Sequence, residues 1–225
     1  MAFPCIRGHH IYDSILGPES IILDLGGHKG EFSTILIEHY GCTSHCVEAM
    51  PDLFQALPKL PRLHAYHYAA SDADGTMTFH IASNPESNSL KLKSEEHHTS
   101  IEVPTISIPT LLSTHGISKI DLLKMDIEGA EIDVIKGMSD SLLTNIQQIT
   151  VEFHDFIPEM NLEEEVLQTI SRLKSLDFAC IVFSRKTHFD VLFLNKQFIS
   201  SQTIIHARII KYIHGLGRMI KRVFS

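Results

Sequence analysis

The chain has 225 residues, of which 44% are hydrophobic and 20% charged, a composition that fits one folded domain with a sizeable core and excludes a disordered chain. Its formal net charge of −8 gives no general reason to bind nucleic acid. No apolar run reaches the roughly 18 residues of a membrane-spanning helix, and no charged region followed by an apolar one opens the sequence. We therefore expect neither a membrane span nor a signal peptide. The four cysteines lack metal-binding spacing, so we expect reduced thiols in a cytoplasmic protein.

The first strong pattern follows an N-terminal segment, residues 1–20, that shows little periodicity. Residues 21–25 form a mostly apolar, branched run that is typical of a buried strand. Gly26, Gly27 and Gly30 then allow a sharp turn, after which apolar residues recur with helical spacing. A strand, a glycine turn and a helix in this order can present backbone N–H groups to a nucleotide-like ligand.

The residues of this turn favour S-adenosylmethionine (SAM) over a dinucleotide. A dinucleotide fingerprint would read G-x-G-x-x-G, whereas here Asp24 comes first and His28 stands where a pyrophosphate needs a residue without a side chain. SAM has no phosphate, and the ammonium group of its methionine end suits a carboxylate such as Asp24. Glu48, at the end of the next apolar run, is placed to bind both ribose hydroxyls. The alternative interpretation is a strand-to-helix turn without any ligand.

The rest of the chain alternates strand and helix patterns up to a closing pair of strands. We expect strands over residues 63–70, 75–82, 101–108, 120–126, 146–154, 178–184 and 191–194, and helices over 51–58, 109–115, 129–136 and from 161. This order predicts an α/β fold with a doubly wound sheet, mostly parallel with an antiparallel C-terminal edge strand, in one domain over residues 21–200. The polar stretch 83–100 fits either a disordered insertion or an active-site lid.

Charged residues gather where two further strands end, and ligands of open α/β sheets bind at such ends. Lys124, Asp126 and Glu128 surround one strand-to-helix turn, which Gly129 leaves open. A carboxylate here is suited to receive a proton, or to bind the SAM methionine end or a metal. Acids at a helix N-terminus are, however, also stabilising without any ligand. Glu131, close to the same turn, is expected to face solvent or to form a salt bridge.

His154, after the next strand, is the best general base by side-chain chemistry, because the unperturbed pKa of histidine lies near neutrality. The competing interpretation is a structural histidine at a strand end. Glu152, His154 and Asp126 converge only if their strands are neighbours. In that case a hard divalent ion held by the three is conceivable, although we expect no resident metal.

Four ordered blocks of the sequence together resemble the FkbM family of SAM-dependent methyltransferases. They are Asp24-Leu-Gly-Gly-His-Lys-Gly-Glu-Phe-Ser33, Val47-Glu48-Ala-Met-Pro51, Leu123-Lys-Met-Asp-Ile-Glu-Gly-Ala-Glu131 with Lys136-Gly137, and Val151-Glu-Phe-His154. The similarity covers about residues 20–195, and the third block is its most specific part. It implies a class I methyltransferase (Rossmann-like) fold, SAM as the methyl donor, and usually O-methylation of a hydroxyl on a sugar, glycan or natural product.

The family pattern also implies roles for individual positions. The implied cofactor-binding residues are Asp24, Gly26, Gly27, His28 and Gly30 in the turn under the methionine end, Glu48 at the ribose, Ser71 and Asp72 near the adenine, and Asp126 and Glu128 in the acidic turn. His28 departs from the pattern, since many relatives have a small or amide residue there. The catalytic candidates are His154 or Asp126, which would accept a proton late in an in-line displacement at the sulfonium, with Lys124 beside them.

Residues 201–225 lie outside the resemblance and form a basic amphipathic pattern. A helix here would suit an anionic membrane surface, or would pack on the domain or on a second copy of the chain, and the sequence leaves both open. Two other functions also stay open, a non-catalytic SAM-binding or interaction protein and an NAD-dependent oxidoreductase, although the missing dinucleotide fingerprint argues against the second. The expected partner is a small-molecule or glycan acceptor rather than nucleic acid, and its identity is not encoded in any readable motif.

Overall fold

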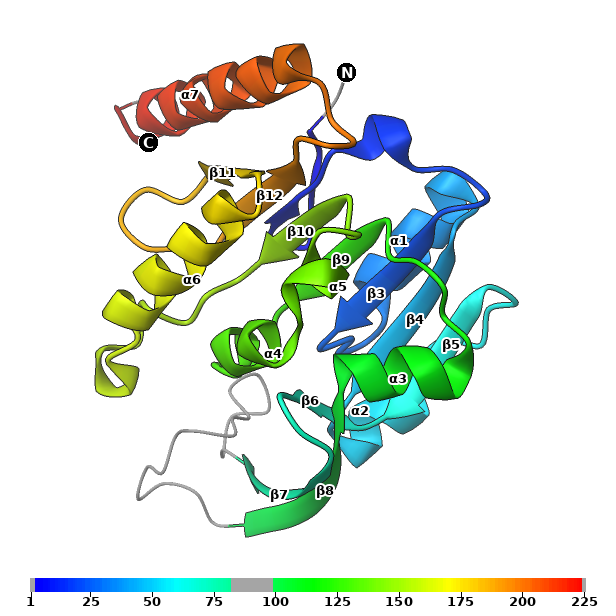
Figure 1. The fold of residues 1–225 in the computed structure, drawn as a ribbon. Helices are drawn as coiled ribbons and strands as arrows, with labels where there is room; N and C mark the ends of the chain where they lie inside the picture. Colours follow the sequence, from blue (N-terminus) through cyan, green and yellow to red (C-terminus); the bar gives the residue numbers. More distant parts are fainter. Residues whose placement is uncertain (1–2, 82–98, 224–225) are drawn as a thin grey trace.

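The centre of the computed structural model, which describes residues 3–81 and 99–223, is a seven-stranded sheet (Figure 1). The strand order is β11-β12-β10-β9-β3-β4-β5. The strands are β3 (Ile21–Leu25), β4 (Thr43–Glu48), β5 (Leu63–His67), β9 (Leu122–Met125), β10 (Gln148–Val151), β11 (Phe178–Val182) and β12 (Val191–Asn195). β3, β4, β5, β9 and β10 pair in parallel, so their carboxyl ends meet at one edge of the sheet.

The one antiparallel strand of this sheet lies one place in from the edge. β12 pairs antiparallel with β10 on one side and with β11 on the other, so β11 is the edge strand. The predicted doubly wound, mostly parallel sheet and its closing antiparallel pair are therefore confirmed. The reversed strand, β12, was expected at the edge but lies between β11 and β10, because the chain returns from β11 into the space beside β10.

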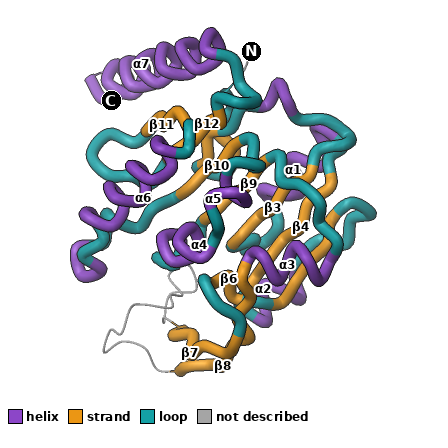
Figure 2. The backbone as a smooth tube through the Cα atoms, in the orientation of Figure 1, coloured by secondary structure: helices purple, strands orange, loops and turns teal. Residues whose placement is uncertain are grey.

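Helices cover both faces of the sheet, as the ribbon and tube views show (Figures 1 and 2). The helices are α1 (Glu31–Tyr40), α2 (Pro51–Ala56), α3 (Ile108–His115), α4 (Glu131–Gly137), α5 (Asp140–Leu143), α6 (Glu163–Ser175) and α7 (Ser201–Val223). Successive residues of a strand point to opposite faces. Leu23 and Leu123 accordingly belong to the core formed with α3 to α6, whereas Ile22 and Leu122 pack with α1.

A second, three-stranded sheet of order β6-β8-β7 lies beyond the carboxyl end of β5 (Figure 1). It consists of β6 (Ala69–Ser71), β7 (Gly75–Ile81) and β8 (Thr99–Ser107), and the predicted pairing of 75–82 with 101–108 is confirmed. The single strand expected over 63–70 is instead divided, because β5 joins the main sheet while β6 pairs with β8. Residues 82–98 lie outside the described residues, and so does most of the stretch interpreted as an insertion or lid.

The N-terminal segment folds into a hairpin on the main sheet, followed by the 3₁₀ turn η1 (Asp13–Ile15). Strands β1 (Cys5–Ile6) and β2 (His9–His10) are joined by Arg7 and Gly8, both with positive φ, as a two-residue hairpin turn requires. Tyr12 exchanges two hydrogen bonds with the side-chain amide of Gln148 on β10, which ties the segment to the sheet. This hairpin brings residues into the functional edge that the sequence did not indicate.

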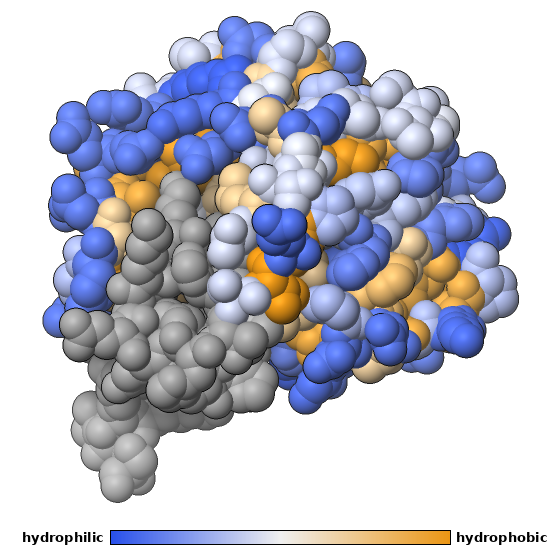
Figure 3. Space-filling view, turned by 90° about the horizontal axis from the view of Figure 1, so that it is seen from below, coloured by the Kyte–Doolittle hydropathy of each residue, from blue (hydrophilic) through white to orange (hydrophobic). Residues whose placement is uncertain are grey.

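The C-terminal helix predicted over 201–225 is present as α7, which packs against β11 (Figure 1). Ile204 and Ala207 are buried in that contact, whereas Ile205, Ile209 and Tyr212 are exposed. None of the helices in the described part of the chain combines the length and the apolar character needed to span a lipid bilayer. The described atoms on the face seen from below mix polar residues with small apolar patches (Figure 3).

Candidate active site

A row of polar side chains crosses the centre of the main sheet. Cys46, Asp24, Lys124 and Thr150 are register partners on four neighbouring strands, so they lie side by side on the face that carries α1. The Lys124 amino group lies 3.2 Å from Asp24 Oδ1, and Asp24 Oδ2 accepts a hydrogen bond from Ser33. Burial lowers the pKa of Lys124, but Asp24 and Asp126 together raise it above its usual value. Lys124 therefore stays charged within the fold.

The glycine turn after β3 is shaped by close packing against its neighbours. A Cβ at Gly26, whose φ is +78°, would lie 1.8 Å from the carbonyl oxygen of Asp126, and one at Gly27 would lie 2.0 Å from Cys46 Sγ. The N–H groups of Gly26 and Gly27 both donate to the carbonyl of Val47. These two glycines are thus needed by the fold itself, and their N–H groups are already used. The N-terminus of α1, which begins at Glu31, leaves the N–H groups of its first turn toward a ligand.

Glu48 holds the turn from the end of β4. Its carboxylate accepts hydrogen bonds from the backbone N–H of His28 at 2.7 Å and of Met50 at 2.8 Å, one on each oxygen. Burial raises the pKa of Glu48, while these two hydrogen bonds act in the opposite direction. Each carboxylate oxygen can accept a second hydrogen bond, so two neighbouring hydroxyls remain within its capacity. His28 itself adopts φ +50°, a left-handed conformation that its place in the turn demands.

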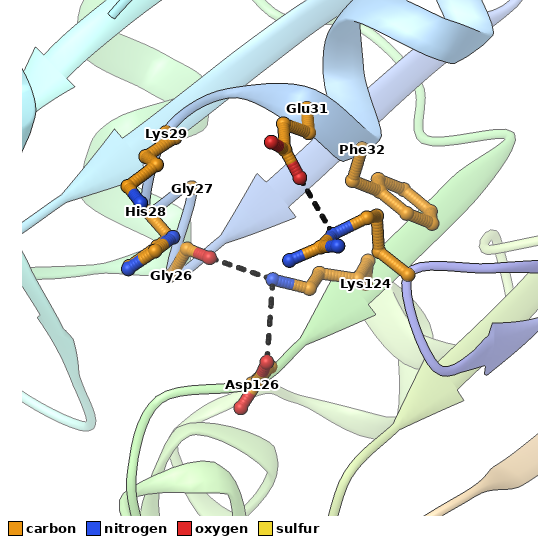
Figure 4. Close-up of a pocket in the computed structure, with 9 residues that line it drawn as sticks. Gly26, Gly27, His28, Lys29, Glu31, Phe32, Lys124 and Asp126 are labelled. Carbon is orange, nitrogen blue, oxygen red and sulfur yellow. Dashed lines mark hydrogen bonds and ion pairs between the residues drawn. The ribbon is translucent and has the colours of Figure 1, made fainter. Parts of the chain in front are cut away.

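A cavity of about 100 Å³ opens between this turn and the end of β9 (Figure 4). It is lined by Arg7, Gly26, Gly27, His28, Lys29, Glu31, Phe32, Lys124 and Asp126. Figure 4 shows the Lys124 amino group between the Gly26 carbonyl, to which it donates at 2.6 Å, and the Asp126 carboxylate at 4.0 Å. Cations and anions alternate around this space, which suits a zwitterionic group such as an α-amino acid.

Asp126 lies at the centre of the charged residues at this edge and contacts several of them. Its Oδ2 lies 3.7 Å from His9 Nε2, and its Oδ1 lies 3.9 Å from His154 Nε2. Burial tends to raise the pKa of Asp126, but Lys124 and the two histidines hold it below the usual range. The carboxylate is therefore ionised at neutral pH, with about a third of its side chain exposed. β9 and β10 are neighbours, so the condition that the sequence analysis set for convergence is met, and Asp126 lies beside His154.

Glu131 organises the acidic turn from inside the fold, so of the two expected alternatives, solvent exposure or a salt bridge, the structure shows the second. It is fully buried, and one carboxylate oxygen accepts hydrogen bonds from the N–H groups of Ile127 and Gly129. The same oxygen lies 3.0 Å from His154 Nδ1, so the expected salt bridge is present. Burial lowers the pKa of His154, but its contacts with Glu131 and the nearby acids outweigh this and raise it to about 9.

Two further carboxylates complete the edge. Glu128 Oε2 lies 3.4 Å from His154 Nε2, and burial raises the pKa of Glu128 to about 7. Glu152 lies just after β10, where burial and the charge of Asp126 raise its pKa to about 7 as well. The charged residues that resemble the family's third and fourth blocks thus form one cluster at the carboxyl ends of β9 and β10.

The structure brings most of the predicted site residues to one edge, in separate roles. Gly26, Gly27, His28, Lys124 and Asp126 line the cavity; Asp24, Gly30, Glu48, Glu128 and His154 support or flank it. Ser71 is the last residue of β6 and donates a side-chain hydrogen bond to Asp72, which follows it, and neither residue lines the cavity. Their predicted adenine contact stays a prediction.

Sequence reasoning missed the residues that the N-terminal hairpin supplies. Arg7 lines the cavity and pairs with Glu31 at 2.8 Å, and His9 is buried beside Asp126. The one available signal was the Arg7–Gly8 pair, because a glycine between short apolar segments is typical of a tight hairpin turn. Two strands of two residues each give no periodicity to detect.

The residues present fit the amino-acid end and the ribose of SAM. The first turn of α1 and Arg7 offer positive charge for a carboxylate, and Asp126 offers negative charge for an ammonium group. Glu48 offers acceptors for a diol. Asp24, by contrast, is inaccessible and already neutralised by Lys124, so it would act on the ligand only through that lysine.

Comparison with known proteins agrees with this geometry. The methyltransferase FkbM domain matches residues 24–180 of the chain. The 2-O-methyltransferase NoeI of Sinorhizobium fredii is 26% identical over 159 residues, which cover 61% of this chain and 65% of NoeI. The 31-O-demethyl-FK506 methyltransferase FkbM of Streptomyces tacrolimicus is 26% identical over 175 residues, or 62% of this chain and 67% of that protein. The chain therefore spans about two thirds of the length of these relatives.

A solved structure supports the same fold. The crystal structure of methyltransferase FkbM from Methylobacillus flagellatus KT superposes with a TM-score of 0.54 at 13% identity, covering 80% of this chain and 44% of that one. This likeness and the strand order confirm the predicted class I methyltransferase fold. Because the domain match covers more than half of the chain and includes the glycine turn and the acidic turn, the chain belongs to the FkbM methyltransferase family.

Proposed function

We propose that this chain transfers a methyl group from SAM to a hydroxyl oxygen of a sugar, a glycan or a natural-product-like small molecule. One observation carries the proposal: the glycine turn, Glu48 and the acid–histidine cluster around Asp126 share one edge of the sheet. Methyltransferases of this family use SAM, and the two relatives described above are named as a 2-O-methyltransferase and a 31-O-demethyl-FK506 methyltransferase.

The cluster supplies what O-methylation requires of a protein. Methyl transfer is an in-line displacement at the sulfonium of the cofactor, which the protein assists by orienting the hydroxyl and accepting its proton. Asp126 and Glu128 each expose about a third of their side chains, so an acceptor can reach them. His154 is nearly buried and is held by Glu131, so it orients these carboxylates rather than touching the acceptor. We therefore assign proton acceptance to Asp126 or Glu128.

Calorimetry with SAM tests the cofactor site. Glu48→Gln keeps the shape of the side chain but removes its charge, and we expect an affinity at least about 10-fold weaker, because hydrogen bonds to a charged acceptor are the stronger ones. Glu102→Gln, an exposed glutamate on β8, is the matched control and should bind like the wild type. Asp24 is unsuitable for this test because its loss would break the buried pair with Lys124.

The transfer itself is tested by a screen of hydroxylated sugars and metabolites, with mass spectrometry to detect an added methyl group. Asp126→Asn and Glu128→Gln should bind SAM but lower the turnover of any acceptor found, by about 100-fold or more for the residue that accepts the proton. A folded wild-type sample that binds neither SAM nor S-adenosylhomocysteine would refute the proposed function.

A further inference from the structure

We propose that His9, Asp126 and Glu152 bind one divalent transition-metal ion at the edge of the sheet. His9, the first residue of β2, is fully buried, yet its Nε2 makes no hydrogen bond within the described part of the chain. The nearest acidic oxygen, Asp126 Oδ2, lies 3.7 Å away, too far for a hydrogen bond. A buried imidazole nitrogen without a partner is costly, and it points here to a missing ligand.

The three side chains are close enough to share one ion. One ligand atom from each of His9, Asp126 and Glu152 lies within 4.8 Å of the others. Metal–ligand bonds of about 2.0–2.2 Å span such a group after small rotations of the two carboxylates, which are both partly exposed. Gly8, the residue before His9, does not crowd the Glu152 carboxylate. Even a Cβ added to Gly8 would lie 4.0 Å from Glu152 Oε2.

The ring of His9 is oriented as in metal sites. Its Nδ1 lies 3.4 Å from the hydroxyl of Thr150 on β10, and its ring meets the Phe32 ring edge-on, with 5.8 Å between centroids. In the tautomer that carries the proton on Nδ1, this nitrogen donates to the Thr150 hydroxyl and Nε2 presents the lone pair that a metal needs. The hairpin and β10 thus fix the imidazole before any ion arrives.

The charges around the three residues favour a cation. Lys124 lies 4.0 Å from Asp126 Oδ2, but its own charge is matched by Asp24 at 3.2 Å. Glu152 forms no ion pair with any residue that the structure describes. One imidazole nitrogen with two carboxylates suits Mn²⁺ or Zn²⁺ better than Mg²⁺ or Ca²⁺, which prefer oxygen ligands alone.

Two other groups of side chains have metal-ligand geometry but are already engaged. Cys5, His10 and Asp190 form one, in which His10 and Asp190 bind each other at 2.6 Å. The second comprises Asp126, Glu128 and His154, whose imidazole already contacts Glu128 and Glu131. In the group around His9, by contrast, the buried Nε2 has no acidic oxygen of the described residues closer than 3.7 Å, which is beyond hydrogen-bond distance.

Titration of the purified full chain with Mn²⁺, followed by electron paramagnetic resonance and calorimetry, tests the proposal. We expect one bound ion per chain and an affinity at least about 10-fold weaker in both His9→Asn and Glu152→Gln. Cys5→Ser, from the first alternative group, should bind as the wild type does. Circular dichroism checks that His9→Asn is folded, and Glu152→Gln alters a partly exposed residue and serves as the second, independent variant.

Any one of four results would overturn the assignment. The wild type could fail to bind Mn²⁺ stoichiometrically, or the affinity could be unchanged in both His9→Asn and Glu152→Gln. Alternatively, binding could be lost in Cys5→Ser, or in Glu128→Gln while Glu152→Gln retains it, which would assign the ion to one of the other groups. The measurement needs neither SAM nor an acceptor, so its failure would leave the proposed methyl transfer standing.

Discussion

Lys124 and Asp24 are direct neighbours on strands β9 and β3, and 3.2 Å separates the lysine Nζ from the carboxylate Oδ1 inside the sheet. The remaining hydrogen-bonding capacity of both groups is directed inward. Lys124 also donates to the carbonyls of Leu25 and Gly26, and Asp24 accepts from Ser33. The pair therefore joins the glycine turn to the acidic turn at the two strand ends where the proposed reaction takes place.

Removing one partner of this pair should be costly. Lys124→Met leaves the Asp24 charge buried without compensation, and we expect the free energy of unfolding to fall by about 3–5 kcal/mol. Urea unfolding followed by circular dichroism at neutral pH measures this. The double variant with Asp24→Asn carries neither charge and should recover much of the loss. Lys136→Met, which breaks an exposed pair with Glu165, is the control and should change little. A Lys124 variant as stable as this control would contradict the account.

Gly26 should tolerate no side chain, for two reasons that can be separated. Gly26→Ala adds a Cβ 1.8 Å from the Asp126 carbonyl at a φ of +78°, whereas Gly116→Ala places one at a φ of +64° in open space. The Gly116 variant should therefore lose only the roughly 1 kcal/mol of backbone strain, and the Gly26 variant at least twice that. Thermal unfolding of both compares them. Equal losses would mean that the turn relaxes freely away from β9.

The sequence predicts the central strands and helices well because their signals are local. The apolar run before Gly26 and the one before Asp126 both form buried parallel strands, and helical spacing locates α1, α3, α4 and α6 to within a few residues. The hairpin at residues 5–10 is held instead by distant contacts. His10 binds Asp190 from 180 positions away, and no local pattern records such a contact.

The site follows the same division. The sequence identifies residues at strand ends, among them Asp126, Glu128 and His154, because ligands of parallel sheets bind where the carboxyl ends of the strands meet. Their electrostatic roles could not be identified in this way, since these depend on which charges meet. Asp24 pairs with Lys124 because of the register of their two strands. Glu131 is buried because the chain after β10 brings His154 against it. The sequence alone does not show which charged residues meet in the fold, so it does not determine these roles.

Glu131 should be required for the shape of the acidic turn. Glu128 and Gly129 both have positive φ, and Glu131 satisfies the N–H groups of Ile127 and Gly129. Glu131→Ala leaves these groups and His154 without that acceptor, so we expect a loss of about 1–3 kcal/mol in unfolding free energy. Differential scanning calorimetry measures it. Glu131→Gln keeps an acceptor oxygen and should lose less; an equal loss in both variants would show that charge, not the hydrogen bonds, holds the turn.

A buried histidine away from the site should make stability fall at acid pH. His45 on β4 donates or accepts a 2.8 Å hydrogen bond with Tyr66 and stacks on His64. Burial, with the nearby charges of His64 and His115, lowers the pKa of His45 from 6.5 to about 4. Above pH 6.5 the imidazole is neutral in both the folded and the unfolded chain, so it has no effect on stability there. Between pH 6.5 and 4 the unfolded chain binds a proton that the folded chain does not.

The free energy of unfolding should therefore decline as the pH falls through this window, with a contribution from His45 that reaches about 3 kcal/mol near pH 4. His45→Asn keeps a polar partner for Tyr66 but does not titrate. Urea unfolding of both proteins from pH 7 to 4 should give a shallower decline for the variant. His39→Asn, at an exposed position on α1, is the control and should follow the wild type. Parallel pH profiles for wild type and His45→Asn would mean that this imidazole is protonated as readily in the folded chain as in the unfolded one.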